Sequence, residues 1–109
     1  MSKSQREKGK RGERELARVL RSMGVDSRRT AQHCGKAGTA DVDAWPGVHV
    51  ECKRVESLNV GKAIDQSIRD CPDGSVPIVC HRRSSQPWLV TVRLSDLEAL
   101  AQAVLADVP

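Results

Sequence analysis

Apolar and polar residues repeat with two different periods along this chain, and each change of period marks a new element. The first stretch has the 3, 4, 7 spacing of an amphipathic helix, at Leu16, Val19, Leu20 and Met23. We expect this helix to begin at Gly9 or Lys10 and to be capped by Gly24. A short strand is expected over residues 25–29, and the small and polar residues of 30–40 predict a loop.

A strict alternation of apolar and polar residues follows in 41–44 and again in 48–54. The Trp-Pro-Gly corner at 45–47 separates the two runs, so together they predict a β-hairpin. If the corner sets the register, three pairs face one another: Ala44 with Val48, Asp43 with His49, and Asp41 with Glu51.

In the second half of the chain, a helix is expected from its N-cap Asn59 to about Asp70, with an inward face of Val60, Ile64 and Ile68. Strands are expected over 76–81 and 88–94. Residues 95–98 read as a capping box that opens a last helix, whose apolar face comprises Leu97, Leu100, Ala101, Val104 and Leu105.

The predicted elements follow in the order α, β, β, β, α, β, β, α. A strand, a helix and a strand succeed one another over 48–82, which implies a right-handed parallel crossover. The predicted fold is therefore α/β (α+β), with a mixed central sheet flanked by helices. With 109 residues the chain has material for one core, so a single domain over 1–109 is expected.

Composition narrows the classes of protein to consider. No apolar run approaches the roughly 20 residues of a membrane span, and no secretory signal follows the basic N-terminus, so a cytoplasmic protein is expected. The four cysteines lack the CxxC spacing of a zinc site and are expected to be reduced thiols: Cys34, Cys52, Cys71 and Cys80.

Charge is unevenly distributed. The chain carries a net charge of +4, but residues 1–29 hold ten Lys or Arg and only four acidic residues. We expect a flexible basic arm over 1–8, followed by a basic helix. Such a surplus suits a polyanion, most simply nucleic acid, although a solubilising terminus would have the same composition.

Candidate chemistry lies on the predicted hairpin. Two carboxylates opposed across a strand pair have Cβ atoms about 5 Å apart and repel each other, so Asp41 and Glu51 need a compensating charge. Lys53 shares their face, and paired carboxylates are also what a hard cation such as Mg²⁺ prefers. The alternative is an open, wet sheet face on which these acids pair with surface cations.

The first helix supplies a further carboxylate. At 100° per residue, Glu13 lies about 65° from the centre of the apolar stripe and Glu15 about 95° away on the other flank. Gly9 and Gly12 fall on the side of Glu13, where a missing side chain permits close approach of a backbone or a phosphate. The alternative role for Glu13 is to complement the helix dipole.

Four stretches, in order, resemble the PD-(D/E)XK nuclease superfamily: KGKRGERELARVLRSMG, GTADVDAWPGVHVECKR, NVGKAIDQSIRD and VPIVCHRR. Within it they are most similar to the small archaeal-type Holliday junction resolvases and their phage-encoded relatives. The similarity extends from about Lys8 to Arg93. It implies a restriction-endonuclease-like αβββαβ core and hydrolysis of DNA phosphodiester bonds.

The resemblance also implies roles for single residues. Asp41 takes the place of the motif aspartate, Glu51 that of the second acid and Lys53 that of the motif lysine, while Ala40 stands where the motif has proline. The implied ligands of Mg²⁺, or alternatively Mn²⁺, are Asp41, Glu51, Glu13 and the backbone carbonyl of Cys52, with Asp43 as a substitute for Asp41. Gln66 resembles a glutamine frequent on the family's second helix.

Basic residues outside this site are expected to contact phosphates: Lys3, Arg6, Lys8, Lys10, Arg11, Arg28, Arg29, Lys36, Arg82 and Arg83. No helix resembles a base-reading element, so recognition by DNA shape and backbone is expected. The sequence thus predicts a Mg²⁺-dependent endonuclease that cuts four-way junctions as a homodimer, in the cytoplasm or in that of a phage host. Alternatives are a nicking or flap nuclease of the same superfamily, and a noncatalytic nucleic-acid-binding module.

Overall fold

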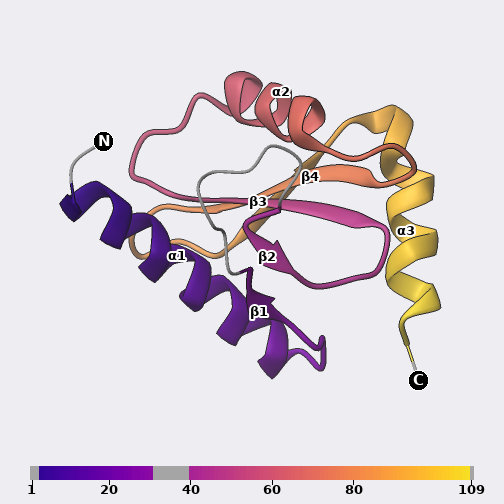
Figure 1. Cartoon of the computed structure of the whole chain (residues 1–109), viewed down its shortest axis with the longest axis horizontal. Coiled ribbons are helices and arrows are strands. Elements are labelled where there is room, and N and C mark those ends of the chain that lie inside the picture. The colour runs from indigo at the N-terminus through magenta and orange to yellow at the C-terminus, as the bar shows by residue number, and fades with distance from the viewer. Residues whose placement is uncertain (1–2, 31–39, 109) are drawn as a thin grey trace.

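The computed structural model describes the backbone of residues 3–30 and 40–108, and their side chains from Glu7 onward. Its elements follow the predicted order (Figure 1), apart from one added 3₁₀ turn, η1. They are α1 (Lys3–Ser22), β1 (Arg28–Arg29), β2 (Val42–Asp43), β3 (Val48–Arg54), α2 (Val60–Asp70), β4 (Val76–Arg82), β5 (Leu89–Val92), η1 (Leu94–Asp96) and α3 (Leu97–Ala106).

Within the described residues, five strands form one sheet in the order β1-β2-β3-β4-β5. β3 and β4 run parallel, and the other neighbouring pairs are antiparallel. α1 packs against β1, β2 and β3, whereas α2 packs against β3, β4 and β5. The two helices lie on opposite faces of the sheet, and α3 lies at one end of it (Figure 1). The predicted mixed sheet flanked by helices is therefore confirmed.

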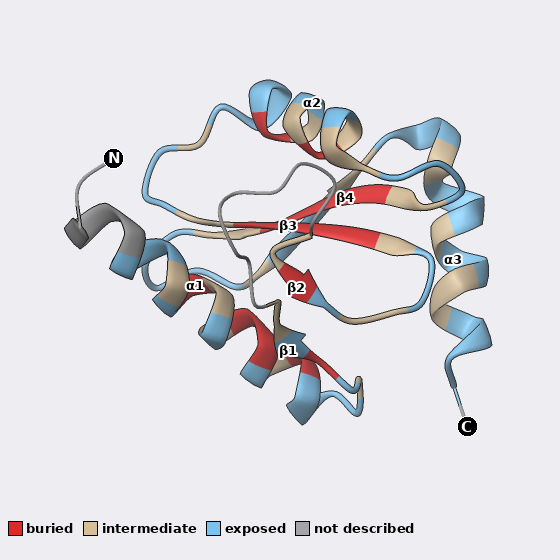
Figure 2. Ribbon diagram, in the orientation of Figure 1, coloured by how far each residue is buried: buried red, intermediate tan, exposed pale blue. Residues whose placement is uncertain are grey.

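The main core lies between α1 and the sheet, where aliphatic side chains and two thiols are buried: Leu16, Ala17, Leu20, Val42, Val50, Cys52, Ile78 and Cys80. β3 and β4 each bury four successive residues, 49–52 and 77–80 (Figure 2). Successive side chains of a strand point to opposite faces, so burial of both faces reflects the helices packed on either side.

The hairpin has the predicted register. Val42 pairs with Val50 in antiparallel orientation, which aligns Asp41 with Glu51. Gly47 forms the corner with φ +79°, a left-handed conformation that glycine adopts without steric cost. Two acidic residues distant from each other in the sequence are thereby brought to one place in the sheet.

α1 is longer than predicted. It begins at Lys3 instead of Gly9 or Lys10, so residues 3–8, expected as a flexible arm, continue the helix. The Lys, Gln, Arg and Glu residues of this stretch are strong helix formers. Glu7 and Lys10 also form an i, i+3 ion pair at 3.8 Å, which supports the helix across Gly9.

α2 begins as predicted but presents a different face to the sheet. The Asn59 side chain caps it by accepting a hydrogen bond from the Lys62 N–H at 3.0 Å. The buried positions are Ala63 and Ser67, whereas Val60, predicted to face inward, is exposed. Small side chains permit close packing, and the Ser67 hydroxyl donates to the carbonyl of Ile78 at 2.9 Å, which explains the rotation.

α3 departs from the prediction at its start and along its face. The capping box is not formed: the helix begins at Leu97 after η1, and the Asp96 side chain pairs with Arg93 at 2.8 Å instead of capping. No residue of α3 is buried, and Leu97 and Leu105 are largely exposed. Leu100 alone among the predicted leucines packs against the core cluster.

The thiols of Cys52, Cys71 and Cys80 are free, as predicted, whereas Cys34 and the expected loop over 31–39 lie outside the described residues. No helix in residues 3–30 and 40–108 is both long and apolar enough to cross a membrane.

Gly12 sets the distance between α1 and the sheet, which yields a first prediction. A Cβ at this position would lie 2.6 Å from the Cβ of Arg54, whereas a Cβ at Gly9 would meet nothing within 4 Å. We expect Gly12→Ala to lower the free energy of unfolding by about 1–2 kcal/mol, because overpacking outweighs the gain in helix propensity. Gly9→Ala should raise it by about 0.5–1 kcal/mol. Urea unfolding measures both changes, and equal effects of the two substitutions would contradict this account.

Candidate active site

Asp41 and Glu51 meet at the point where β2 pairs with β3. Asp41, directly before β2, is half-buried, and its Oδ2 accepts a hydrogen bond from the backbone N–H of Cys52 at 2.9 Å. The carboxyl groups of Asp41 and Glu51 are also hydrogen-bonded to each other. The predicted register therefore brings the two acidic groups into direct contact.

This contact determines the protonation of the pair. Burial, and next the negative charge of Glu51, raise the pKa of Asp41 to about 7. Two adjacent carboxylates in a poorly solvated place cannot both ionise easily, so they hold one proton between them. The sequence left open an exposed sheet face on which these acids pair with surface cations. In the structure a shared proton compensates their charge instead.

Glu51 has a second partner that the sequence analysis did not assign. Its Oε1 lies 3.0 Å from Nε2 of His49, and both side chains are almost fully buried. Burial acts to raise the pKa of Glu51, but hydrogen bonds with His49 and Asp41 hold it below its usual range. The signal was present in the sequence, because residues two apart in a strand share a face.

Glu13 lies near the pair and is already engaged. Its Oε1 accepts a hydrogen bond from Nε of Arg29 at 2.8 Å. Burial raises the pKa of Glu13 although Arg29 opposes the change, and the charge of Glu51 contributes to the rise. The predicted approach of this α1 carboxylate to the hairpin thus agrees with its electrostatic coupling to Glu51 and Asp41.

Three other predicted site residues differ in their exposure and in their relation to the pair. Lys53 is half-buried two residues after Glu51, and its charge helps to lower the pKa of Glu51. Asp43 is exposed, and the structure gives it no part in the hydrogen bonds of the pair, which favours Asp41 as the principal acid. Gln66 is half-buried about 80° from the buried positions of α2, closer to the sheet than its apolar stripe indicated.

The donor set can be compared with the needs of a divalent cation. In residues 3–30 and 40–108, no group of three or more His, Cys, Asp or Glu side chains is arranged to hold a metal ion. Mg²⁺ in nucleotide-processing sites is commonly bound by one or two carboxylates plus waters and substrate phosphates. A pair of carboxylates that shares a proton fits this requirement, because a cation in the place of the proton would satisfy both charges.

Several arginines predicted to contact DNA are engaged within the protein. Arg29 is paired with Glu13, and Arg82 donates a hydrogen bond to Glu15. Among the described side chains, the exposed basic residues of the prediction are Lys8, Arg11, Arg28 and Arg83, with Lys10 partly exposed beside Glu7. Lys36 and the side chains of Lys3 and Arg6 lie outside the described part of the chain. The exposed residues lie along α1 and at the ends of β1 and β4.

No protein-family model matches the chain, and no curated protein matches it. Solved structures do, among them that of Hjc from Archaeoglobus fulgidus, described as a Holliday junction resolvase from an archaeal hyperthermophile. The two chains are 22% identical, with a TM-score of 0.57 over 78% of this chain and 72% of Hjc. This likeness confirms the predicted resolvase-like fold.

The shared proton predicts an unusual pH dependence of stability in the absence of metal. Unfolded Asp41 titrates near pH 4, but the folded protein retains the proton until about pH 7. The native state binds more protons in this window, so the free energy of unfolding should fall as pH rises from about 4 to 7, by up to about 4 kcal/mol. Urea unfolding in chelator measures it.

Asp41→Asn supplies the control for this prediction. It removes the titrating group while keeping the shape of the side chain, so the decline between pH 4 and 7 should largely disappear. Added Mg²⁺ should raise the stability of the wild-type protein above pH 7 and leave the variant nearly unchanged. Parallel pH profiles for the two proteins would show that Asp41 does not hold the proton.

Proposed function

We propose that this protein is a Mg²⁺-dependent endonuclease that hydrolyses phosphodiester bonds of branched DNA, acting on four-way junctions as a homodimer. The observation that carries the proposal is the hydrogen-bonded pair of Asp41 and Glu51, followed by Lys53 on the same strand. The fold shared with Hjc, whose description names a Holliday junction resolvase, supports the substrate class.

Asp41 and Glu51 would hold the cation, with the backbone carbonyl of Cys52 as a further ligand. When bound, Mg²⁺ supplies positive charge to the scissile phosphate and lowers the pKa of a coordinated water. His49 fixes Glu51 by contacting Oε1, one of its two oxygens. Glu51 is therefore oriented before a ligand arrives, and the site needs little reorganisation.

Lys53 has a separate task. Its ammonium group, on the same strand and two residues from Glu51, would position the attacking water and stabilise the negative charge of the transition state. The hairpin thus carries the acids and the base on one short piece of chain.

Substrate choice follows from the distribution of charge. The exposed basic residues of α1 and of the strand ends suit the DNA backbone, and none of the described helices resembles a base-reading element. Two symmetric cuts across a junction require two active sites, so a homodimer is proposed. We place this activity in the cytoplasm, or in the host cytoplasm for a phage-borne protein.

Cleavage assays test the proposal directly. Labelled four-way junction, flap, single strand and linear duplex are incubated with Mg²⁺ or with chelator. We expect paired symmetric cuts in the junction alone, and Lys53→Ala and Glu51→Gln should each slow cleavage at least about 100-fold. Cuts in the flap would favour the alternative nuclease, and binding without any cleavage would favour a noncatalytic module.

Two acids of the hairpin provide a matched comparison for the metal site. Asp41→Asn should reduce cleavage as strongly as Glu51→Gln, because the structure places Asp41 within the pair. Asp43→Asn, the same chemical change on the exposed side chain two residues away, should retain most of the rate. A reversed order would make Asp43 the principal ligand.

The basic face of α1 predicts a salt-dependent contribution to binding. Arg11→Ala should weaken binding to junction DNA in chelator and should reduce the slope of log affinity against log salt by about 1. Arg93→Ala, which removes an exposed arginine paired with Asp96 beside α3, is the control and should change the slope little. Fluorescence anisotropy measures both, and equal slopes for the two variants would remove α1 from the DNA-binding surface.

A further inference from the structure

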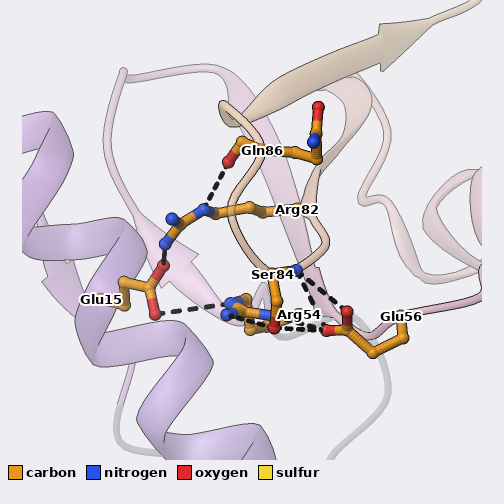
Figure 3. A network of polar contacts seen from close by, with 6 residues as sticks. All are labelled: Glu15, Arg54, Glu56, Arg82, Ser84 and Gln86. Carbon is orange, nitrogen blue, oxygen red and sulfur yellow. Dashed lines mark hydrogen bonds and ion pairs between the residues drawn. The ribbon is translucent and has the colours of Figure 1, made fainter.

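A second cluster of polar groups lies where β3 and β4 end (Figure 3). Its centre is the carboxylate of Glu56, which is exposed and yet makes four hydrogen bonds. The backbone N–H of Ser84 donates to both oxygens, at 3.1 and 3.0 Å, and the Ser84 hydroxyl donates at 2.9 Å. Nη1 of Arg54 donates to the same carboxylate at 3.1 Å.

These donors form a site for an anion, which we call the phosphate seat: the N–H and hydroxyl of Ser84 and the guanidinium of Arg54. The next residue, Ser85, has φ +62°, a left-handed conformation uncommon outside glycine. Turns that combine a left-handed residue with ordinary neighbours direct their N–H groups into concavities that bind anions. The donor set is therefore built for an oxyanion.

The seat is held from behind by α1. Oε2 of Glu15 lies 3.5 Å from Nε of Arg54, and its other oxygen accepts from Arg82 (Figure 3). Nε of Arg82 in turn donates to the carbonyl of Gln86 at 2.6 Å. None of these contacts involves Glu56, so Arg54 should keep its place when that side chain leaves, with its Nη2 still donating to the Ser84 hydroxyl at 3.4 Å.

Glu56 makes these contacts at the protein surface. Its side chain is 65% exposed, and exposed ion pairs contribute little because water competes for both partners. Beside it lies a hollow of about 450 Å³, whose lining includes His81, Arg82 and Arg83. Glu56 itself lines this hollow, and so do two arginines, so a larger anion that displaced the carboxylate would find room and positive charge beside the seat.

We infer that the phosphate seat binds a phosphate of the DNA backbone, and that Glu56 occupies it as a built-in competitor until DNA displaces the carboxylate. A phosphate offers several oxygens to the same N–H, hydroxyl and guanidinium donors, with the charge-assisted geometry that arginine favours. The inference rests on the proposed function, since Arg54 directly follows Lys53 on β3 and the seat lies at the strand end that carries the candidate active site.

DNA binding in chelator tests the inference without requiring cleavage. Glu56→Gln removes the competing charge and should tighten binding of junction and duplex DNA about fivefold at low salt. Glu98→Gln makes the same chemical change on the exposed face of α3 and should give a much smaller gain. Combining Ser84→Ala with Glu56→Gln should remove at least half of the gain.

Each outcome decides the matter. The assignment of the phosphate seat would be refuted if Glu56→Gln and Glu98→Gln raised the affinity for DNA equally. It would also be refuted if Glu56→Gln raised the affinity fully in the Ser84→Ala background. Failure of the wild-type protein and of Glu56→Gln to bind any DNA would overturn both the seat and the proposed function. Binding with these gains but without cleavage would sustain the seat while refuting the endonuclease.

The amide signal of Ser84 in a nitrogen–proton NMR spectrum separates two sources of phosphate. Micromolar DNA should shift this signal strongly in the wild-type protein, as the carboxylate gives way to a phosphate. Millimolar inorganic phosphate should shift it weakly. An equal response to inorganic phosphate would assign the seat to a free anion and overturn its assignment to DNA.

Discussion

The hydrogen bond between Asp41 and Glu51 is the interaction on which the chemistry of this structure depends. It exists because Val42 of β2 pairs with Val50 of β3. This pairing places Asp41, which directly precedes β2, opposite Glu51 of β3. Pressing two carboxyl groups together costs free energy, and the protein offsets that cost with a shared proton. The proposed cation would take the place of that proton, and the contact of His49 with Glu51 orients one of the two carboxyl groups.

α1 contributes to the site mainly through charge. Glu13 and Glu15 leave the helix on two sides and engage arginines of the sheet, Arg29 and Arg82. The sequence predicted both arginines to contact DNA, but in the structure they attach the helix to the strand ends. The arginines that anchor the helix are therefore distinct from the exposed basic residues to which we assign the proposed DNA binding.

The order of elements and the hairpin register followed from the sequence, because alternation and the Pro-Gly corner are local signals. The face of α2 did not: Ala63 and Ser67 are buried since small residues allow the helix close to β4, and a stripe of larger apolar residues gives no measure of that distance. Contacts between segments far apart in the chain, such as Glu56 with Ser84, were likewise invisible. The two acids of the site were predictable because a tight turn connects their strands.

The parallel pairing of β3 and β4 places Cys52 beside Cys80 in the core, and both thiols remain free. Burial raises the pKa of Cys80 to about 12 and that of Cys52 further, so neither forms a thiolate at neutral pH. Both sulfurs lie in the core between α1 and the sheet, so an alkylating reagent reaches them only when that core opens. The rate at which Cys52 and Cys80 become alkylated, followed by mass spectrometry, therefore reports how often this core opens.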